Sequence, residues 1–341
     1  LSFRNIAING AMNIAQRGTQ STASNGYHTV DRWGQDHGGC DEAPTFQQFD
    51  VSPPSSPYHL PTSGNHPYRE GFRKAWGVTN GNQTSGAGTS DRVIIMYRTE
   101  SQDLANSGWN YTSSSSHITF SFYVKSSVAQ NFYVNFKTYD GTGQGYAMET
   151  GSLSANTWTK ITKKIPGNSN LQFDTDTTTN ASDRGLDLSI CPYMGTTYTD
   201  SGATFDQWQA STDSNFAGTD MTTTWFTTND ATLEITGVQL EVGSQATAFE
   251  HRSFGEELSL CQRYCYVVIR HDGSMTGAQA LGGSGSFYSN DDVYMNMDFP
   301  VTMRTTPTLN CVNKSNAFQF PAANAGHNAN TLNLIHGHTN G

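Results

Sequence analysis

Alternating apolar and polar residues mark a series of β-strands along the chain. The alternation runs over nine positions at 117–125 and again at 131–139, where Asp140-Gly141 is a hairpin turn signal. The same alternation predicts further strands at 92–97, 157–166, 185–190 and 231–241, with shorter ones at 5–9, 27–33, 266–269 and 293–299. Strands of this number and spacing, without interleaved helices, predict an all-β fold, namely an antiparallel jelly-roll sandwich.

One helix and one proline-rich stretch divide this pattern. Ser253 and Glu256 have the spacing of a capping box, which predicts a short helix through about residue 264. Residues 50–70 hold five prolines, which exclude a central strand and indicate a long ordered loop. We therefore expect an N-terminal strand and connecting segment at 1–40 and a jelly-roll domain at 41–252. The short helix and a small β domain follow at 253–341, and we expect that domain to be incomplete at its C-terminus.

Composition narrows the class of protein. Charged residues make up only 14%, and 19 Lys and Arg against 29 Asp and Glu give a net charge of −10. Without a basic groove, nucleic-acid binding is not expected. No apolar run reaches the ~18–20 residues of a membrane span, so membrane insertion is not expected either. The chain opens at Leu1 without a signal-peptide pattern, and we expect it to be a piece of a longer polypeptide. The five scattered cysteines predict free thiols in a protein made in a reducing cytosol.

Aromatic residues in polar, loop-like stretches are the candidate ligand contacts. Sugar rings stack their C–H faces on Trp and Tyr, while Asn, Gln and Asp bond the hydroxyls. The predicted ligand-binding residues are Trp76, Trp109, Tyr111, Tyr198 and Trp208, with Tyr58 and Tyr68 in similar surroundings. The alternative for each is a place in the core, where most Trp and Tyr area is buried. Trp33 and Trp158 lie within strand patterns and are expected in the core.

Metal sites are suggested at two places. Asp174, Asp176 and Asp183, with Asp187 close by, are oxygen ligands of the kind that hold a structural Ca²⁺. Because the Gly and distal Glu of an EF-hand loop are missing, a solvated loop is the favoured interpretation. Cys261 and Cys265 share a helix face but have too few neighbouring ligands for a metal, so they are expected to pack as small hydrophobes. No GxSxG, HExxH or P-loop motif is present, and nothing in the sequence indicates an enzyme.

Several strings, taken in order, resemble a family of structural proteins from the tail fibres and related appendages of tailed phages. They are Arg4-Asn5-Ile6-Ala7-Ile8-Asn9-Gly10-Ala11-Met12, Gln16-Arg17-Gly18-Thr19, Val30-Asp31-Arg32-Trp33, Thr236-Gly237-Val238-Gln239-Leu240-Glu241-Val242-Gly243, Phe249-Glu250-His251-Arg252-Ser253-Phe254-Gly255-Glu256-Glu257-Leu258, Cys261-Gln262-Arg263-Tyr264, and Phe299-Pro300-Val301-Thr302-Met303-Arg304 with Pro307-Thr308. The resemblance covers about residues 4–310. It implies a jelly roll similar to a carbohydrate-binding module, in a virion assembled in the host cytoplasm.

Three functions remain open from the sequence. The first is a tail-fibre or similar appendage protein that binds host-surface glycan, and the second is a non-binding decoration or connector protein of capsid or tail. A polysaccharide depolymerase is the least favoured. The partners implied by the first two are other virion proteins and, for the adhesin, the host cell-surface glycan.

The C-terminal part leads us to expect a homotrimer. Fibres of this family are commonly threefold, and residues 259–341 are too few and too polar to build a generous core alone. In a trimer, His336 and His338 would offer six imidazoles around the axis, an octahedral metal site. The favoured alternative is an exposed tail in which both histidines are unremarkable.

Overall fold

The computed structural model describes residues 4–53, 66–173, 183–212, 217–218, 221–268, 285–287, 293–295, 298–308, 318–322 and 325–329. The chain divides into two compact units, Leu1–Phe254 and Gly255–Gly341. Each unit is described by itself.

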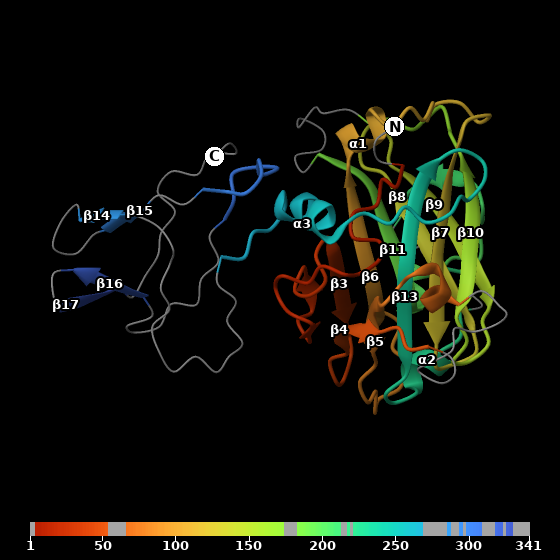
Figure 1. Ribbon diagram of the computed structural model, residues 1–341. Coiled ribbons are helices and arrows are strands. Elements are labelled where there is room, and N and C mark those ends of the chain that lie inside the picture. The colour runs from red at the N-terminus through yellow and green to blue at the C-terminus, as the bar shows by residue number, and fades with distance from the viewer. Residues whose placement is uncertain are drawn as a thin grey trace. The chain divides into compact units, whose positions relative to one another are not determined.

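The first unit is built from two antiparallel sheets (Figure 1). Sheet A has the strand order β1-β4-β5-β13-β7-β10, and sheet B has the order β12-β9-β8-β11-β6-β3-β2. The strands of sheet A are β1 (Gln20–Ser21), β4 (Thr45–Asp50), β5 (Lys74–Thr79), β7 (His117–Ser126), β10 (Thr159–Pro166) and β13 (Thr232–Val242). Those of sheet B are β2 (Asn25–Gly26), β3 (Trp33–Gly38), β6 (Arg92–Glu100), β8 (Asn131–Lys137), β9 (Gln144–Ser152), β11 (Arg184–Met194) and β12 (Trp208–Ala210). The predicted antiparallel jelly-roll sandwich is thereby confirmed.

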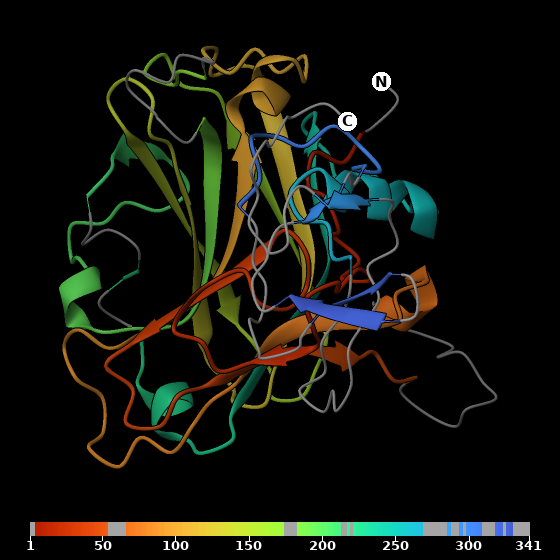
Figure 2. The same cartoon turned by 90° about the vertical axis from the view of Figure 1, so that its left-hand side faces the viewer.

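Short helical segments connect the strands of this unit. They are η1 (Pro67–Glu70), α1 (Ser101–Ala105), η2 (Thr196–Tyr198) and α2 (Thr224–Thr227). Figure 2 shows α1 and α2 at opposite ends of the long strands. Within the described part of the chain, no helix has the length and apolar character needed to cross a membrane.

The core lies between the two sheets and is largely aromatic. Strand alternation sends one set of side chains inward from each sheet. Sheet A contributes Phe46, Phe120 and Phe122, which are at most 1% exposed. From sheet B, Trp33 lies 4.9 Å from Tyr97 between ring centroids. Such ring pairs add about 0.5–1.5 kcal/mol each beyond the area that they bury.

A β-bulge in β13 keeps its apolar side chains in the core along the whole strand. Leu233 and Ile235 are buried on one side of the bulge, and Val238 and Leu240 on the other, so the alternation changes phase between them. The pairing of β13 with β7 shifts register between Thr236 and Gln239. Gly237 sits in that gap with φ of +63°, a conformation that L side chains rarely adopt.

The predicted strands at 92–97, 117–125, 131–139, 157–166, 185–190 and 231–241 all correspond to long strands of the sandwich. The sequence did not predict β1, β2, β4, β5, β9 or β12, and of the strand predicted at 27–33 only Trp33 lies in a strand, β3. Residues 5–9 are not in a strand, because their N–H groups bond to separate partners rather than to one neighbouring strand: Ile6 N donates to the Leu240 carbonyl at 2.8 Å and Ile8 N to the Tyr97 hydroxyl at 2.7 Å. Residues 1–40, expected as a separate connecting segment, supply β1, β2 and β3 to the two sheets.

The second unit holds helix α3 and two hairpins. α3 (Phe254–Gln262) confirms the predicted helix after Ser253. β14 (Gly285–Phe287) pairs with β15 (Val293–Met295), and β16 (Phe318–Ala322) pairs with β17 (Ala325–Ala329). Residues 266–268 of the predicted strand at 266–269 are not in a strand, and residue 269 lies outside the described residues.

Candidate functional site

Two of the predicted sugar contacts are core residues, which corrects the expectation from the sequence. Trp76 lies in β5, is fully buried, and donates from Nε1 to Thr29 Oγ1 at 2.8 Å. Trp109 follows α1 in a loop, but that loop folds over the end of the sandwich and leaves the residue 3% exposed, against Phe173. Neither ring has a face available to a sugar at the surface.

The other predicted contacts, Tyr111, Tyr198 and Trp208, are half-buried and lie in separate places. Tyr111 packs edge-on against Phe173, with ring centroids 5.0 Å apart. The hydroxyl of Tyr198 in η2 accepts from Arg92 at 3.3 Å. Trp208 in β12 donates from Nε1 to the Pro166 carbonyl at 2.7 Å. Each has a packing role in the fold. Tyr68 is also half-buried, stacked on Arg73, and Tyr58 lies outside the described residues.

Only some of the predicted metal ligands lie among the residues that the structure describes. Asp183 is half-buried at the start of β11, and its carbonyl accepts from Ser101 N at 3.1 Å. Asp174, Asp176, His336 and His338 lie outside the described residues. Among the residues that the structure does describe, no three His, Cys, Asp or Glu side chains group as a metal site.

The cysteines that are described carry free thiols. They are Cys40, Cys191, Cys261 and Cys265. Cys261 is fully buried in α3, as expected of a small hydrophobe. Cys265 lies just past the helix end, where its N–H donates to the Cys261 carbonyl at 3.2 Å. Burial raises the pKa of the Cys191 thiol to about 12, which makes it unreactive in the folded chain.

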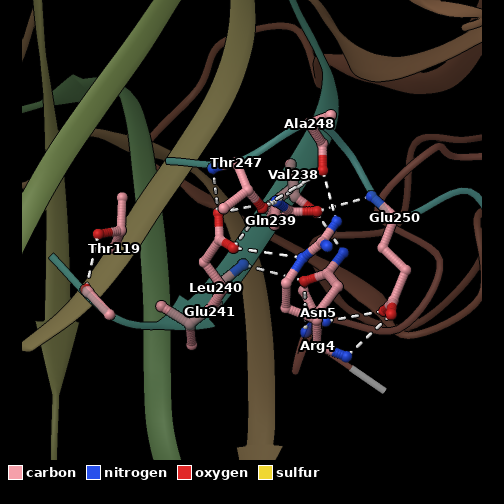
Figure 3. A network of polar contacts seen from close by, with 12 residues as sticks. Arg4, Asn5, Thr119, Val238, Gln239, Leu240, Glu241, Thr247, Ala248 and Glu250 are labelled. Atoms are coloured by element: carbon pink, nitrogen blue, oxygen red, sulfur yellow. Dashed lines mark hydrogen bonds and ion pairs between the residues drawn. The ribbon is translucent and has the colours of Figure 1, made fainter. Parts of the chain in front are cut away.

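Three of the strings that carry the family resemblance meet in one polar network, which we call the N-terminal clamp (Figure 3). It joins Arg4 and Asn5, Gln239 and Glu241 on β13, and Glu250 with Arg252. The Glu250 carboxylate accepts from Arg4 N at 2.9 Å and from Asn5 N at 2.8 Å. Arg252 donates to the Asn5 carbonyl and pairs with Glu250 at 3.2 Å. The clamp therefore ties the start of the unit to its end.

The side chain of Asn5 bonds to three backbone groups of the chain. It is 2% exposed, donates from Nδ2 to the Val238 carbonyl at 3.0 Å, and accepts from Ala7 N at 3.0 Å and from Leu240 N at 2.9 Å. Gly10 approaches the same strand so closely that a Cβ there would lie 2.0 Å from the Val238 carbonyl oxygen. These residues are used in folding, because their polar groups are satisfied within the chain.

A different cluster, on the outer side of sheet B, has groups that face solvent. We call it the Arg98 face and define it by Tyr27, Arg98, Lys137, Tyr139, Arg184 and Asp187. Tyr97, Phe136 and Leu186 point into the core, so the alternation turns Arg98, Lys137 and Asp187 outward. Asp187 on β11 lies opposite Arg98 on β6 and Lys137 on β8, which places the three in one row across adjacent strands.

Two half-exposed tyrosines flank this row. The Tyr139 hydroxyl donates to Asp187 Oδ2 at 3.1 Å, and its ring lies 4.9 Å from the Arg184 guanidinium carbon and 5.5 Å from Lys137 Nζ. On the other side Tyr27 covers Gly34, where a Cβ would lie 3.3 Å from Tyr27 Cε1. Because glycine has no side chain, Gly34 leaves room for the Tyr27 ring.

Asp187 is the buried centre of the Arg98 face. Its Oδ2 accepts from Arg98 Nε at 3.0 Å and pairs with Arg184 at 3.5 Å. Its Oδ1 is buried and has no hydrogen-bond partner among the described residues. Burial raises the pKa of Asp187, against the two arginines, which lower it. Burial and the Asp187 charge raise the pKa of Tyr139 to about 12, so its hydroxyl is a hydrogen-bond donor at neutral pH.

Tyr27, Arg98, Lys137 and Tyr139 were not expected in a site, and Asp187 was considered only as a neighbour of the candidate Ca²⁺ ligands. The available signal was alternation, because Lys137 and Asp187 occupy the polar phase of predicted strands and Arg98 directly follows the strand predicted at 92–97. That they meet depends on β11 lying between β6 and β8, which one sequence does not reveal.

Comparisons with known proteins add little to this picture. No protein-family model matches the chain, and no curated protein matches it. Among solved structures, one described as "CBM4 structure and function" is 11% identical over 50% of this chain and 70% of that one, with a TM-score of 0.26. The cellulose-binding domain of β-1,4-glucanase C from Cellulomonas fimi is 9% identical over 68% and 97%, with a TM-score of 0.30.

Tailspike protein 4 of bacteriophage CBA120 is 7% identical to this chain, with a TM-score of 0.32. The match covers 70% of this chain but only 21% of the tailspike chain. Because all these TM-scores lie well below 0.5, the fold and the candidate site rest on the strands and contacts described above.

Proposed function

We propose that the chain is a glycan-binding structural protein of a phage virion, a tail fibre or similar appendage, and that the Arg98 face holds the glycan. The virion role follows from the resemblance of the strings at 4–12, 236–243 and 249–258. The binding role is carried by one observation. Two half-exposed tyrosine rings flank a row of charged side chains that are fixed on adjacent strands.

This arrangement suits a sugar for two physical reasons. The half-exposed rings offer apolar surface to the C–H groups of a sugar, and Arg98 offers hydrogen-bond donors beside them, with the positive charges of Arg184 and Lys137 close to Tyr139. Since strands hold these groups, little freedom is lost on binding.

The test is glycan-array binding of the full chain with single tyrosine variants. We expect Tyr27→Ala and Tyr139→Ala each to weaken binding by about 5- to 150-fold, which corresponds to about 1–3 kcal/mol for a stacked ring by analogy with bases on aromatics. The matched control is Tyr68→Ala, because Tyr68 is also half-buried but packs with the cluster on the outer side of sheet A. Folding is checked for each variant by tryptophan fluorescence.

Normal binding by both folded variants would contradict the proposal for this face. A wild-type chain that binds no glycan would favour the decoration or connector protein. Release of new reducing ends from host polysaccharide would instead identify a depolymerase, so the same samples are assayed for that product.

The assembly proposal is a homotrimer in which residues 259–341 supply much of the contact between chains. Light scattering of the full chain tests it. A monomer at micromolar concentration would contradict it.

A further inference from the structure

We infer that the glycan held by the Arg98 face is acidic, and that the Arg98 guanidinium binds its oxyanion, a carboxylate, a sulfate ester or a phosphate ester. The inference rests on the proposed function, because it names the class of ligand for that same face.

Arg98 is held in place from one side and open on the other. Its Nε donates to Asp187 Oδ2 at 3.0 Å, which anchors one edge of the guanidinium. Within the described residues, its two terminal nitrogens have no hydrogen-bond partner, and the side chain is 33% exposed. A guanidinium fixed in this way presents a free pair of N–H donors whose spacing matches two oxygens of an oxyanion.

The charges of this face are arranged with cations outward and carboxylates inward. The side chains of Arg98 and Arg184 are 33% and 30% exposed, whereas that of Asp187, their shared partner, is 10% exposed. Glu100, opposite Arg184 in the pairing of β6 with β11, is also buried, and its carboxylate accepts from Gln102 at 2.5 Å. A ligand at the surface therefore meets the cations first.

This arrangement stands out in a chain with a net charge of −10. An acidic polymer would be repelled by most of such a surface, so a site for it needs a local group of cations. Arg98, Arg184 and Lys137 form that group around Tyr139, with Arg184 and Lys137 within 5.5 Å of its ring centre. One sugar could thus stack on Tyr139 while its acidic substituent reaches Arg98.

The experiment compares binding to matched acidic and neutral polymers. The pairs are alginate and carboxyl-reduced alginate, dextran sulfate and dextran, and phosphomannan and mannan, which distinguish the three oxyanions. We expect the full-length wild type to bind at least one acidic polymer roughly 10-fold or more tightly than its neutral counterpart. In Arg98→Gln that preference should disappear. Arg98→Lys, which keeps the charge without the paired donors, should retain part of it.

Two controls separate this effect from general attraction or unfolding. Arg69→Gln removes an exposed cation within η1 and should leave the preference unchanged. Arg98→Lys keeps a cation beside Asp187, so it guards against loss of binding through misfolding. Binding of the acidic polymer should also weaken as salt rises in the wild type, and less so in Arg98→Gln.

The outcomes separate the inference from the proposed function. Equal binding of acidic and neutral polymers, with loss of both in Tyr27→Ala, would overturn the inference and leave the proposed function standing. An acidic preference unchanged in Arg98→Gln would also overturn the inference. Failure of the wild type to bind any of the polymers would count against both.

Discussion

We expect one small substitution in the N-terminal clamp, Asn5→Ala, to lower the free energy of unfolding by a large amount. The side chain of Asn5 makes three hydrogen bonds to backbone groups of residues 7, 238 and 240, and the residue is 2% exposed. The substitution therefore leaves two N–H groups and one carbonyl buried without this partner. Three hydrogen bonds at about 1 kcal/mol net each, with part of the desolvation penalty of the groups left behind, give about 3–5 kcal/mol in the free energy of unfolding.

Urea and thermal unfolding of the full chain, followed by tryptophan fluorescence, measure this loss. All six tryptophans lie within Leu1–Phe254, so the signal reports the sandwich alone. At roughly 2–4 °C per kcal/mol, Tm should fall by about 6–20 °C. The control is Asn170→Ala, an exposed asparagine in a loop, which should change Tm by no more than a few degrees. A loss below about 1 kcal/mol for Asn5→Ala would refute the assignment of these hydrogen bonds as stabilising.

Two further predictions concern the same clamp. Burial raises the pKa of Glu250, but the N–H groups of Arg4 and Asn5 and the charge of Arg252 lower it by more, so it lies below its usual 4.5. The stabilising contribution of Glu250 is then present above pH 4.5 and is lost as pH falls through the folded-state pKa. In urea titrations between about pH 6 and 3, the wild type should therefore lose more stability than Glu250→Gln. Parallel pH profiles of the two proteins would contradict this. In thermal unfolding, Gly10→Ala should destabilise the chain by at least about 2 kcal/mol, because the new Cβ would lie 2.0 Å from a backbone oxygen. Gly255→Ala in α3 is the control, because a Cβ there has no atom within 4 Å. It should leave the free energy of unfolding unchanged or raise it by up to about 1 kcal/mol.

The fold could be predicted where alternation is unbroken. The strands at 117–126 and 131–137 alternate cleanly, and the phase change at Gly237 is visible in the sequence as well. β5 escaped prediction because Gly77 interrupts it and Lys74 and Asn80 give it the appearance of a loop. In the structure, a Cβ at Gly77 would lie 2.0 Å from the Leu233 carbonyl oxygen, so the glycine serves close pairing with β13. Trp76 was taken for a loop residue for the same reason.

The candidate site could be predicted much less well. Sequence alternation places Lys137 and Asp187 on the polar side of predicted strands, and Arg98 just past the end of one, yet 89 residues separate the partners Arg98 and Asp187. Only the strand order of sheet B brings them together. Tyr27 lies outside the strands altogether, and its place over Gly34 depends on a loop conformation. Residue type alone favoured tryptophans and tyrosines, whose large apolar area also makes them common core residues.

The N-terminal clamp also decides how a mechanical load would pass through the sandwich. Residues 4 and 5 are bonded directly to residue 250, so a force applied between the two ends of this unit acts first on those bonds. The load then bypasses β6, β8 and β11, which carry the Arg98 face. The hydrogen bonds of Glu250, backed by its pair with Arg252, would have to break together before tension reached a strand. An adhesion surface built on this unit would thus keep its geometry while the chain on either side is pulled.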